Sequence, residues 1–222
     1  MNLSRLPSIG YPMLVVATIA VVLVPAHLQL LGWTERGDHH FLQRGLFLYL
    51  MLSALVPVAA DRRQIWIAIG LSLLVIASWR TGPEGISAAE LGSQLIFLLY
   101  VASHLLMALI RTEKANTQAI FAAICLYLIV ALIWGRIFTG LEMWSPGAFT
   151  LDPSLPLAVK AEALSYYSFV TISSLGYGDI YPTLEAARAW AVIEVIFGQF
   201  YIAIVVARLV SLYLRESSSE TA

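Results

Sequence analysis

The sequence contains few charged residues for its length. Only 12% of its 222 residues are Asp, Glu, Lys or Arg, whereas 59% are hydrophobic. A soluble domain carries about 25% charged residues, so this chain has too little polar surface to cover a globule in water. The net charge of −1 also gives nucleic acid no electrostatic attraction. The composition therefore excludes an ordinary soluble or nucleic-acid-binding domain and indicates a membrane protein.

Groups that carry out catalysis are also scarce. Cys125 is the only cysteine, so the chain cannot form an intrachain disulfide. No nucleophile–base pair, phosphate-binding glycine loop or cluster of metal ligands stands out in the sequence. We therefore expect no enzyme activity and no bound cofactor.

Long apolar runs are abundant. Each of six runs comes near or above the ~20 residues that a helix needs to cross a ~30 Å hydrocarbon core, and charged segments separate the first five. The runs cover residues 10–31, 41–60, 64–79, 88–110, 117–138 and 188–214. We predict an all-α membrane protein with six transmembrane helices, and the even count places both termini on the same side.

The segment between the fifth and sixth runs differs from the other connections. It contains four prolines and an amphipathic stretch at 160–173 that is too short to span a membrane and leads into Gly-Tyr-Gly at 176–178. Non-helical backbone at membrane depth is tolerated only where protein buries it or where it lines water. We therefore predict a re-entrant pore helix followed by a loop, between helices 5 and 6.

The residues at 171–179, Thr-Ile-Ser-Ser-Leu-Gly-Tyr-Gly-Asp, resemble the signature sequence of the potassium channel family. The resemblance covers 117–214 and implies an outer helix, a pore helix, a selectivity filter and an inner helix. It also implies that backbone carbonyls and the first hydroxyl of the filter bind K⁺, while its glycines adopt left-handed conformations without a Cβ penalty. The implied filter residues are Ser174, Leu175, Gly176, Tyr177 and Gly178, of which the first four would bind K⁺.

Other residues would support this filter. Tyr167 takes the place of an aromatic residue that, in the family, bonds the aspartate matching Asp179. Thr171 and Ser173 add hydroxyl groups beside the filter. Glu194 lies inside the last run, and because ionisable groups at membrane depth are costly and usually functional, we expect it to support the filter from the inner helix.

Two more residues of the last run have expected roles in the inner helix. Gly198 lies 20 residues after Gly178 (198 − 178 = 20), where many family members have a hinge glycine. Close helix packing, which small residues serve in membranes, is the alternative role for this glycine. Arg208 would lie near the inner mouth, where it either reaches the headgroups or tunes cation flux.

The segment that resembles the family departs from the family pattern at three positions. Ser174 replaces the usual threonine, and it keeps the oxygen but lacks the methyl group that fixes the rotamer, so we expect a looser innermost ion site. Leu175 replaces valine. Val170 stands where some relatives carry a glutamate behind the filter, which argues against inactivation of that particular kind.

The expected domains are a four-helix transmembrane domain similar to a voltage sensor (1–114), a pore domain (115–216) and a polar tail (217–222). The fourth run, 88–110, contains no Lys or Arg. Each charge that crosses the field is worth ~2.3 kcal/mol per 100 mV, so without such charges we expect weak or absent voltage gating. One chain supplies one filter loop and a ring of four is required, so we expect a homotetramer with fourfold symmetry.

The pore-loop resemblance implies that both termini lie in the cytoplasm. Nine carboxylates, Glu142 among them, would then face outward, and those near the pore would concentrate cations at its mouth. The compact architecture without sorting signals suggests a prokaryotic inner membrane. The expected partners are membrane lipid, further copies of the chain and permeant K⁺, and no soluble partner is implied.

Three alternatives to a selective potassium channel stay open. A weakly selective cation channel is the nearest, although non-selective relatives often lose the aromatic residue that Tyr177 provides. Coupled potassium transporters repeat the pore unit about four times in one chain, and this sequence has one such unit. A non-conducting membrane scaffold or modulatory subunit is the third.

Overall fold

The computed structural model describes residues 10–30, 39–58, 62–79, 86–112 and 116–220. Within these ranges the fold is all-α, as predicted, and the only strand-like pairing is an isolated bridge between Phe149 and Pro182. The seven helices are α1 (Gly10–Leu30), α2 (His39–Val58), α3 (Arg62–Ser78), α4 (Ala88–Ile110), α5 (Thr117–Trp144), α6 (Leu157–Ile172) and α7 (Glu185–Glu220).

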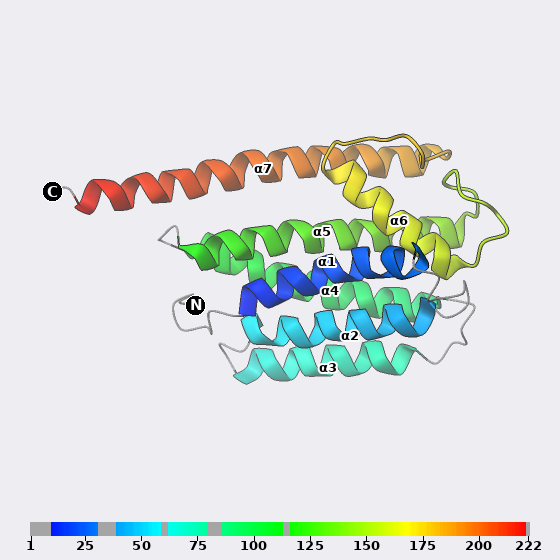
Figure 1. Cartoon of the computed structure of the whole chain (residues 1–222), viewed down its shortest axis with the longest axis horizontal. Helices are drawn as coiled ribbons and strands as arrows, with labels where there is room; N and C mark the ends of the chain where they lie inside the picture. The colour runs from blue at the N-terminus through cyan, green and yellow to red at the C-terminus, as the bar shows by residue number, and fades with distance from the viewer. Residues whose placement is uncertain (1–9, 31–38, 59–61, 80–85, 113–115, 221–222) are drawn as a thin grey trace.

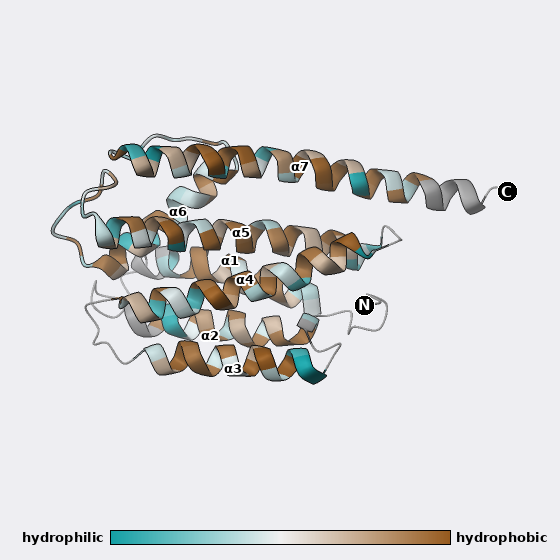
Figure 2. Cartoon of the chain, turned by 180° about the vertical axis from the view of Figure 1, so that it is seen from behind, coloured by the Kyte–Doolittle hydropathy of each residue, from teal (hydrophilic) through white to brown (hydrophobic). Residues whose placement is uncertain are grey.

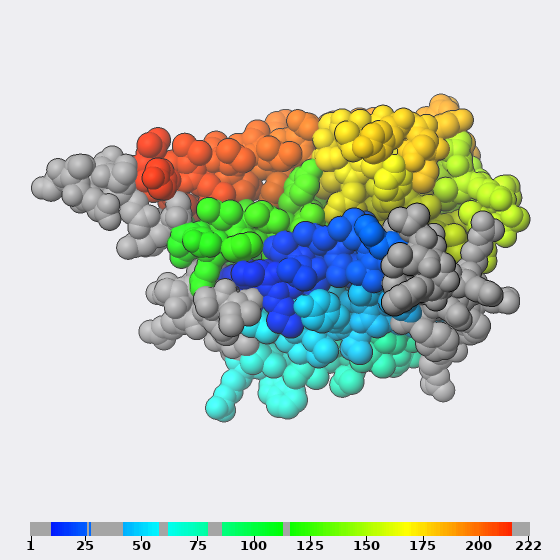
Figure 3. Space-filling view, viewed as in Figure 1, coloured from blue at the N-terminus to red at the C-terminus, as the bar shows by residue number. Residues whose placement is uncertain are grey.

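Six of the helices lie side by side and the seventh, α6, crosses them obliquely (Figure 1). Helices α1 to α4 form a bundle on one side of α5, and α7 lies on the other side. Helix α6 packs between α5 and α7 at one end of the molecule, and α7 forms an edge of it (Figure 3). Helix α5 therefore lies between the four-helix bundle and α7, and it packs against both.

Three helices of the described chain are long and apolar enough to cross a membrane: α4, α5 and the Glu185–Leu214 part of α7. Apolar residues run along these helices in Figure 2. Helices α1 and α2 contain shorter apolar stretches, Gly10–Pro25 and Leu42–Pro57. The count of six spans therefore stays a prediction, whereas a multi-pass arrangement is shown.

Helices α5 and α7 are both longer than the apolar runs that predicted them. Thr139 and Gly140 looked like the end of α5, but the Thr139 hydroxyl donates to the Gly135 carbonyl within the helix, at 2.8 Å. A Cβ on Gly140 would lie 3.3 Å from a methyl carbon of Leu91, so this glycine serves the packing of α4 on α5. Helix α7 reaches Glu220 and thus enters the segment expected to be a polar tail.

Candidate functional site

Helix α6 and the segment that follows it form a hairpin. Helix α6 starts at one end of the molecule and runs inward, and residues 173–184 return to that same end, where α7 begins (Figure 1). The C-terminal end of α6 is closed by backbone bonds, because the Val170 carbonyl accepts from Leu175 N at 2.9 Å and from Gly176 N at 3.3 Å. The hairpin thus brings the glycine motif to the middle of α7 and anchors it there.

The backbone of this motif alternates in handedness. Ser174, Gly176 and Gly178 have φ of +58°, +59° and +77°, and the residues between them have negative φ. In an extended strand, successive carbonyls point to opposite sides. Reversing the sign of φ at every second residue turns the carbonyls toward one side instead. Glycine enters this region freely, whereas Ser174 does so at a conformational cost that its sequence position did not reveal.

A residue that the sequence analysis did not single out fixes the first hydroxyl of the motif. Gln199 on α7 donates from Nε2 to the Ser174 hydroxyl oxygen at 2.7 Å. Both side chains are exposed in the single chain. The contact constrains the serine rotamer that we expected to be loose, because the amide of Gln199 supplies the restraint that a threonine methyl would supply.

The tyrosine that meets Asp179 is Tyr166, not Tyr167 as the resemblance implied. Desolvation raises the pKa of the Tyr166 hydroxyl, and the nearby Asp179 carboxyl raises it further. Tyr167 points the other way and packs edge-to-face against Phe138 and Phe149, with ring centroids 5.2 and 5.3 Å away. Neighbouring residues of a helix differ by about 100° in direction, so a shift of one residue exchanges the two roles.

The two hydroxyls expected beside the filter serve α6 itself. Ser173 donates to the Phe169 carbonyl at 2.7 Å. Thr171 is buried, and its side chain interacts with that of Tyr167 one turn earlier on α6. Both residues therefore make their side-chain contacts within the C-terminal part of α6.

Gly198 lies where α7 passes closest to the end of α6. A Cβ at this position would lie 2.2 Å from the Ile172 carbonyl oxygen, far inside van der Waals contact. The same carbonyl accepts from the Tyr127 hydroxyl on α5 at 3.1 Å. Close packing is thus sufficient reason for a glycine here, and the hinge role stays a prediction.

Glu194 is completely buried between α7, α6 and α5. The Ser168 hydroxyl oxygen lies 2.5 Å from Glu194 Oε1 and 2.7 Å from the Ala131 carbonyl oxygen. A hydroxyl has one hydrogen and a carbonyl can only accept, so both contacts are satisfied only if the carboxyl group itself donates to Ser168. We infer from this accounting that Glu194 is a protonated acid, which also avoids burying an unpaired charge.

Glu142 does not face the outer solution as expected. It is 2% exposed, and it forms an ion pair with Lys160 of α6 at 3.1 Å. Its carboxylate also accepts from the backbone N–H groups of Gly147 and Phe149, at 3.1 and 3.3 Å. This carboxylate therefore ties the end of α5 to the loop and to α6, and it is removed from the set that could attract cations.

Arg208 links the far part of α7 to the end of α4. Its guanidinium donates to the carbonyl oxygens of Ile110 and Thr112, at 2.7 and 3.1 Å. Cationic side chains stabilise the free carbonyls at a helix C-terminus. Neither role expected for Arg208 describes this contact, which joins the four-helix bundle directly to α7.

A comparison with known families identifies the domain that contains this site. Residues 160–215 match a family model described as an ion channel. The match runs from α6 into α7, so it includes the alternating segment together with Glu194, Gly198 and Gln199. No curated protein and no solved structure matches the chain.

The fold and this match define the class of protein. The chain is an integral, multi-pass membrane protein with an ion channel domain over residues 160–215. Ion channels move ions without covalent chemistry, so the match confirms the expectation that the protein is not an enzyme.

Proposed function

We propose that this protein is a potassium-selective channel that conducts K⁺ passively down its electrochemical gradient. The observation that carries the proposal is the alternation of φ at Ser174, Gly176 and Gly178. A dehydrated K⁺ requires a shell of oxygens in place of water, and rings of backbone carbonyls provide one. A segment whose carbonyls turn toward one side can supply stacked rings when four copies meet around an axis.

The exposed surface of the single chain supports a homotetramer. Leu175 and Tyr177 of the alternating segment are 55% and 67% exposed, although both side chains are large and largely apolar. Helix α7 also exposes most of its apolar side chains. Four copies around a common axis would cover both surfaces and would complete the ion sites, which one chain cannot form alone.

The same proposal includes six membrane spans, a re-entrant α6 and a cytoplasmic location of both termini in a prokaryotic inner membrane. Helix α4 contains no Lys or Arg, so we propose that the channel responds weakly or not at all to voltage. The contact of Arg208 with the end of α4 offers a route by which the bundle could act on α7 instead.

Recording from the purified protein in planar bilayers tests the proposal. With opposing K⁺ and Na⁺ gradients, the reversal potential should follow the K⁺ gradient, and Gly178→Ala should abolish this selectivity because φ is +77° there. Gly147→Ala is the matched control. It places the same residue at a similar positive φ, +86°, but in the α5–α6 loop and outside the alternating segment. A reversal potential set equally by Na⁺ would instead support a weakly selective channel, and silent bilayers for all three proteins would support a non-conducting subunit.

A further inference from the structure

A cavity of about 500 Å³ lies where the four-helix bundle meets α5 and α6. Val21 and Val22 of α1 and Phe47 of α2 give it an apolar lining. The rest of the lining comes from α4, α5, α6 and the residues after the alternating segment, and it carries several charged groups. The volume is within the range of small-molecule sites in proteins, about 300–1,000 Å³.

Arg136 of α5 is the anomalous residue of this cavity. Its side chain lines the cavity and the residue is only 7% exposed, yet within the described chain its Nε has no hydrogen-bond acceptor. Glu90 and Glu162 attract it electrostatically, but neither forms an ion pair with it among the described residues. A guanidinium has five N–H donors, and a buried one normally has acceptors for them.

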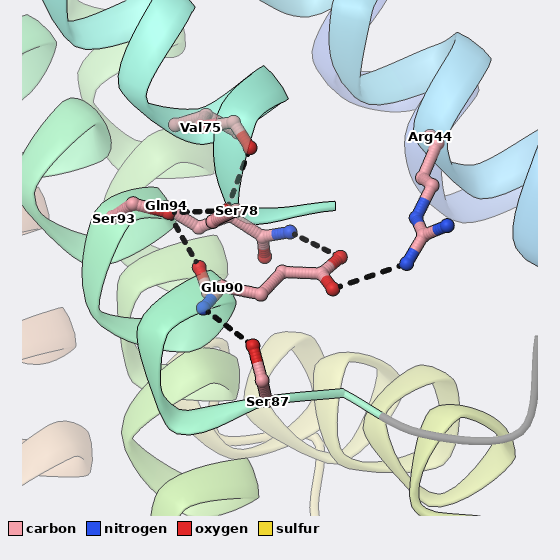
Figure 4. A network of polar contacts seen from close by, with 7 residues as sticks. All are labelled: Arg44, Val75, Ser78, Ser87, Glu90, Ser93 and Gln94. Atoms are coloured by element: carbon pink, nitrogen blue, oxygen red, sulfur yellow. Dashed lines mark hydrogen bonds and ion pairs between the residues drawn. The ribbon is translucent and has the colours of Figure 1, made fainter. Parts of the chain in front are cut away.

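Two acceptors in the same cavity lack donors. Oε1 of Glu162 and Oε1 of Gln94 are both buried without a hydrogen-bond partner among the described residues. Glu90, by contrast, is satisfied: its carboxylate pairs with Arg44 at 3.2 Å and accepts from the Gln94 amide at 3.3 Å (Figure 4). Once the Arg44–Glu90 pair is set aside, Arg136 presents donors and a positive charge, while Glu162 presents an acceptor and a negative charge.

We propose that this cavity binds the headgroup of a phospholipid that carries both a phosphate and a primary ammonium group. A phosphate provides the acceptors that the planar fork of Arg136 requires. The ammonium provides three donors, which suit Oε1 of Glu162 and Oε1 of Gln94. The apolar lining from α1 and α2 accommodates the beginning of the acyl chains.

Other lipid headgroups satisfy this site less completely. A quaternary ammonium, as in phosphatidylcholine, has no N–H to donate, and phosphatidylglycerol has no cation. Burial raises the pKa of Glu162 to about 7, although Arg136 lowers it. An ammonium beside Glu162 favours the ionised form, so the discrimination is strongest above neutral pH.

The position of the site connects it to the candidate pore. Tyr166 and Asp179, which interact electrostatically near the end of the alternating segment, line the same cavity. A bound headgroup therefore touches the pore hairpin and α1, α2 and α4 at once. The inference concerns a binding site beside the proposed filter, and its test does not depend on whether the filter selects K⁺.

Lipid binding to the purified full-length protein tests the inference directly. The protein is titrated at about pH 8 with dioleoyl phosphatidylethanolamine, phosphatidylcholine or phosphatidylglycerol, and bound lipid is counted by native mass spectrometry. Phosphatidylethanolamine should bind about tenfold more tightly than the other two, as the loss of a charge-assisted hydrogen bond requires. Equal binding of the three lipids, tighter binding of phosphatidylglycerol, or no binding above background would each overturn the proposal.

Two variants separate the roles of the two charges. Arg136→Gln should weaken binding of phosphatidylethanolamine and phosphatidylglycerol alike by about tenfold. Glu162→Gln, which keeps the shape of the side chain, should remove the preference for phosphatidylethanolamine over phosphatidylcholine. Arg111→Gln, at the exposed opposite end of α4, is the matched control and should change neither value. If Arg136→Gln does not fold, Glu162→Gln alone tests the proposal. An unchanged preference for phosphatidylethanolamine over phosphatidylcholine in Glu162→Gln would overturn the role of the ammonium.

Discussion

Helices α5 and α7 have similar apolar character and opposite burial. In the most apolar part of α5, 67% of the residues are buried inside the chain, whereas in α7 the share is 6%. Helix α5 packs against α1, α4, α6 and α7, while the packing of α7 is mainly against α5 and α6. Helix α5 is therefore covered by its own chain, and α7 needs lipid or other copies of the chain to cover it.

The buried part of α7 is a single stripe. Its members are spaced by four, three and four residues, as one face of a helix requires, and all but one are small. They are Ala187, Ala191, Glu194 and Gly198. Small residues allow helices to approach closely in membranes, so this stripe is the surface that faces α5 and α6. The other faces are exposed and mostly apolar, as the colours along α7 in Figure 2 show, and we expect the two surfaces to respond differently to substitution.

The largest effect is expected on the buried stripe, at Gly198. Gly198→Ala should prevent the pairing of α7 with α6, because the new Cβ would lie 2.2 Å from the Ile172 carbonyl oxygen. Overpacking typically costs about 1–3 kcal/mol and occasionally more. Because a backbone oxygen cannot move aside as a side chain can, we expect the cost here to exceed the upper end of that range. Thermal unfolding in detergent should show a large loss of stability.

Gly92→Ala on α4 is the control for this prediction, since nothing lies within 4 Å of a Cβ there. It should be neutral or stabilising by about 0.5–1 kcal/mol. If Gly198→Ala unfolds at the wild-type temperature but no longer opens, the packing explanation is wrong and the hinge role is favoured.

The exposed face of α7 should give the next largest effect, on assembly rather than on folding. Phe200 is 62% exposed, and truncating a large aromatic side chain in a packed interface costs on the order of 3 kcal/mol per copy. Phe200→Ala should therefore lower the tetramer fraction measured by light scattering. Leu99→Ala, at a 54% exposed position on α4, should leave that fraction unchanged, and equal effects at both positions would contradict an interface on α7.

The contrast between these helices also shows what the sequence can predict. The six apolar runs located six of the helices and the amphipathic stretch at 160–173 located α6, because apolar length and periodicity are local properties. The ends of α5 and α7 were each missed by six residues (144 − 138 = 6 and 220 − 214 = 6). The glycines at 176 and 178 predicted left-handed backbone at these positions, because the conformational freedom of glycine is also a local property. Contacts across the fold were not predictable in this way: Gln199 meets Ser174 over 25 residues, and Glu142 is held by Lys160 of α6 and by backbone groups of the α5–α6 loop. The exchange of Tyr167 for Tyr166 beside Asp179 depends on the rotation of α6, which one sequence does not define.

Glu194, the one ionisable member of the buried stripe, should tolerate its amide isostere. If the carboxyl group is protonated and donates to Ser168, Glu194→Gln can donate the same bond and should change stability by less than about 0.5 kcal/mol. Glu194→Leu loses the bond and should cost about 1 kcal/mol. Infrared spectroscopy near neutral pH should show the carbonyl stretch of a buried carboxylic acid, absent in Glu194→Gln. If Glu194→Gln instead removes a carboxylate stretch from the spectrum, Glu194 is ionised and the inference of a protonated acid is wrong.

The smallest effect is expected from Gln199, an exposed polar residue of α7. Its bond to the Ser174 hydroxyl restrains the rotamer of the oxygen that we propose as an ion ligand. Gln199→Leu should lower the K⁺ over Na⁺ permeability ratio about fivefold, as the loss of roughly 1 kcal/mol of hydrogen bonding implies.

A double-mutant cycle with Ser174→Thr distinguishes this restraint from a general disturbance of α7. A threonine methyl fixes the rotamer by itself, so Gln199→Leu should have little further effect once Ser174→Thr is present. Any strain that Ser174→Thr adds at a φ of +58° occurs in both arms of the cycle and cancels in the coupling energy. If the two substitutions are additive, Gln199 does not act through Ser174, and the exposed face of α7 serves assembly alone.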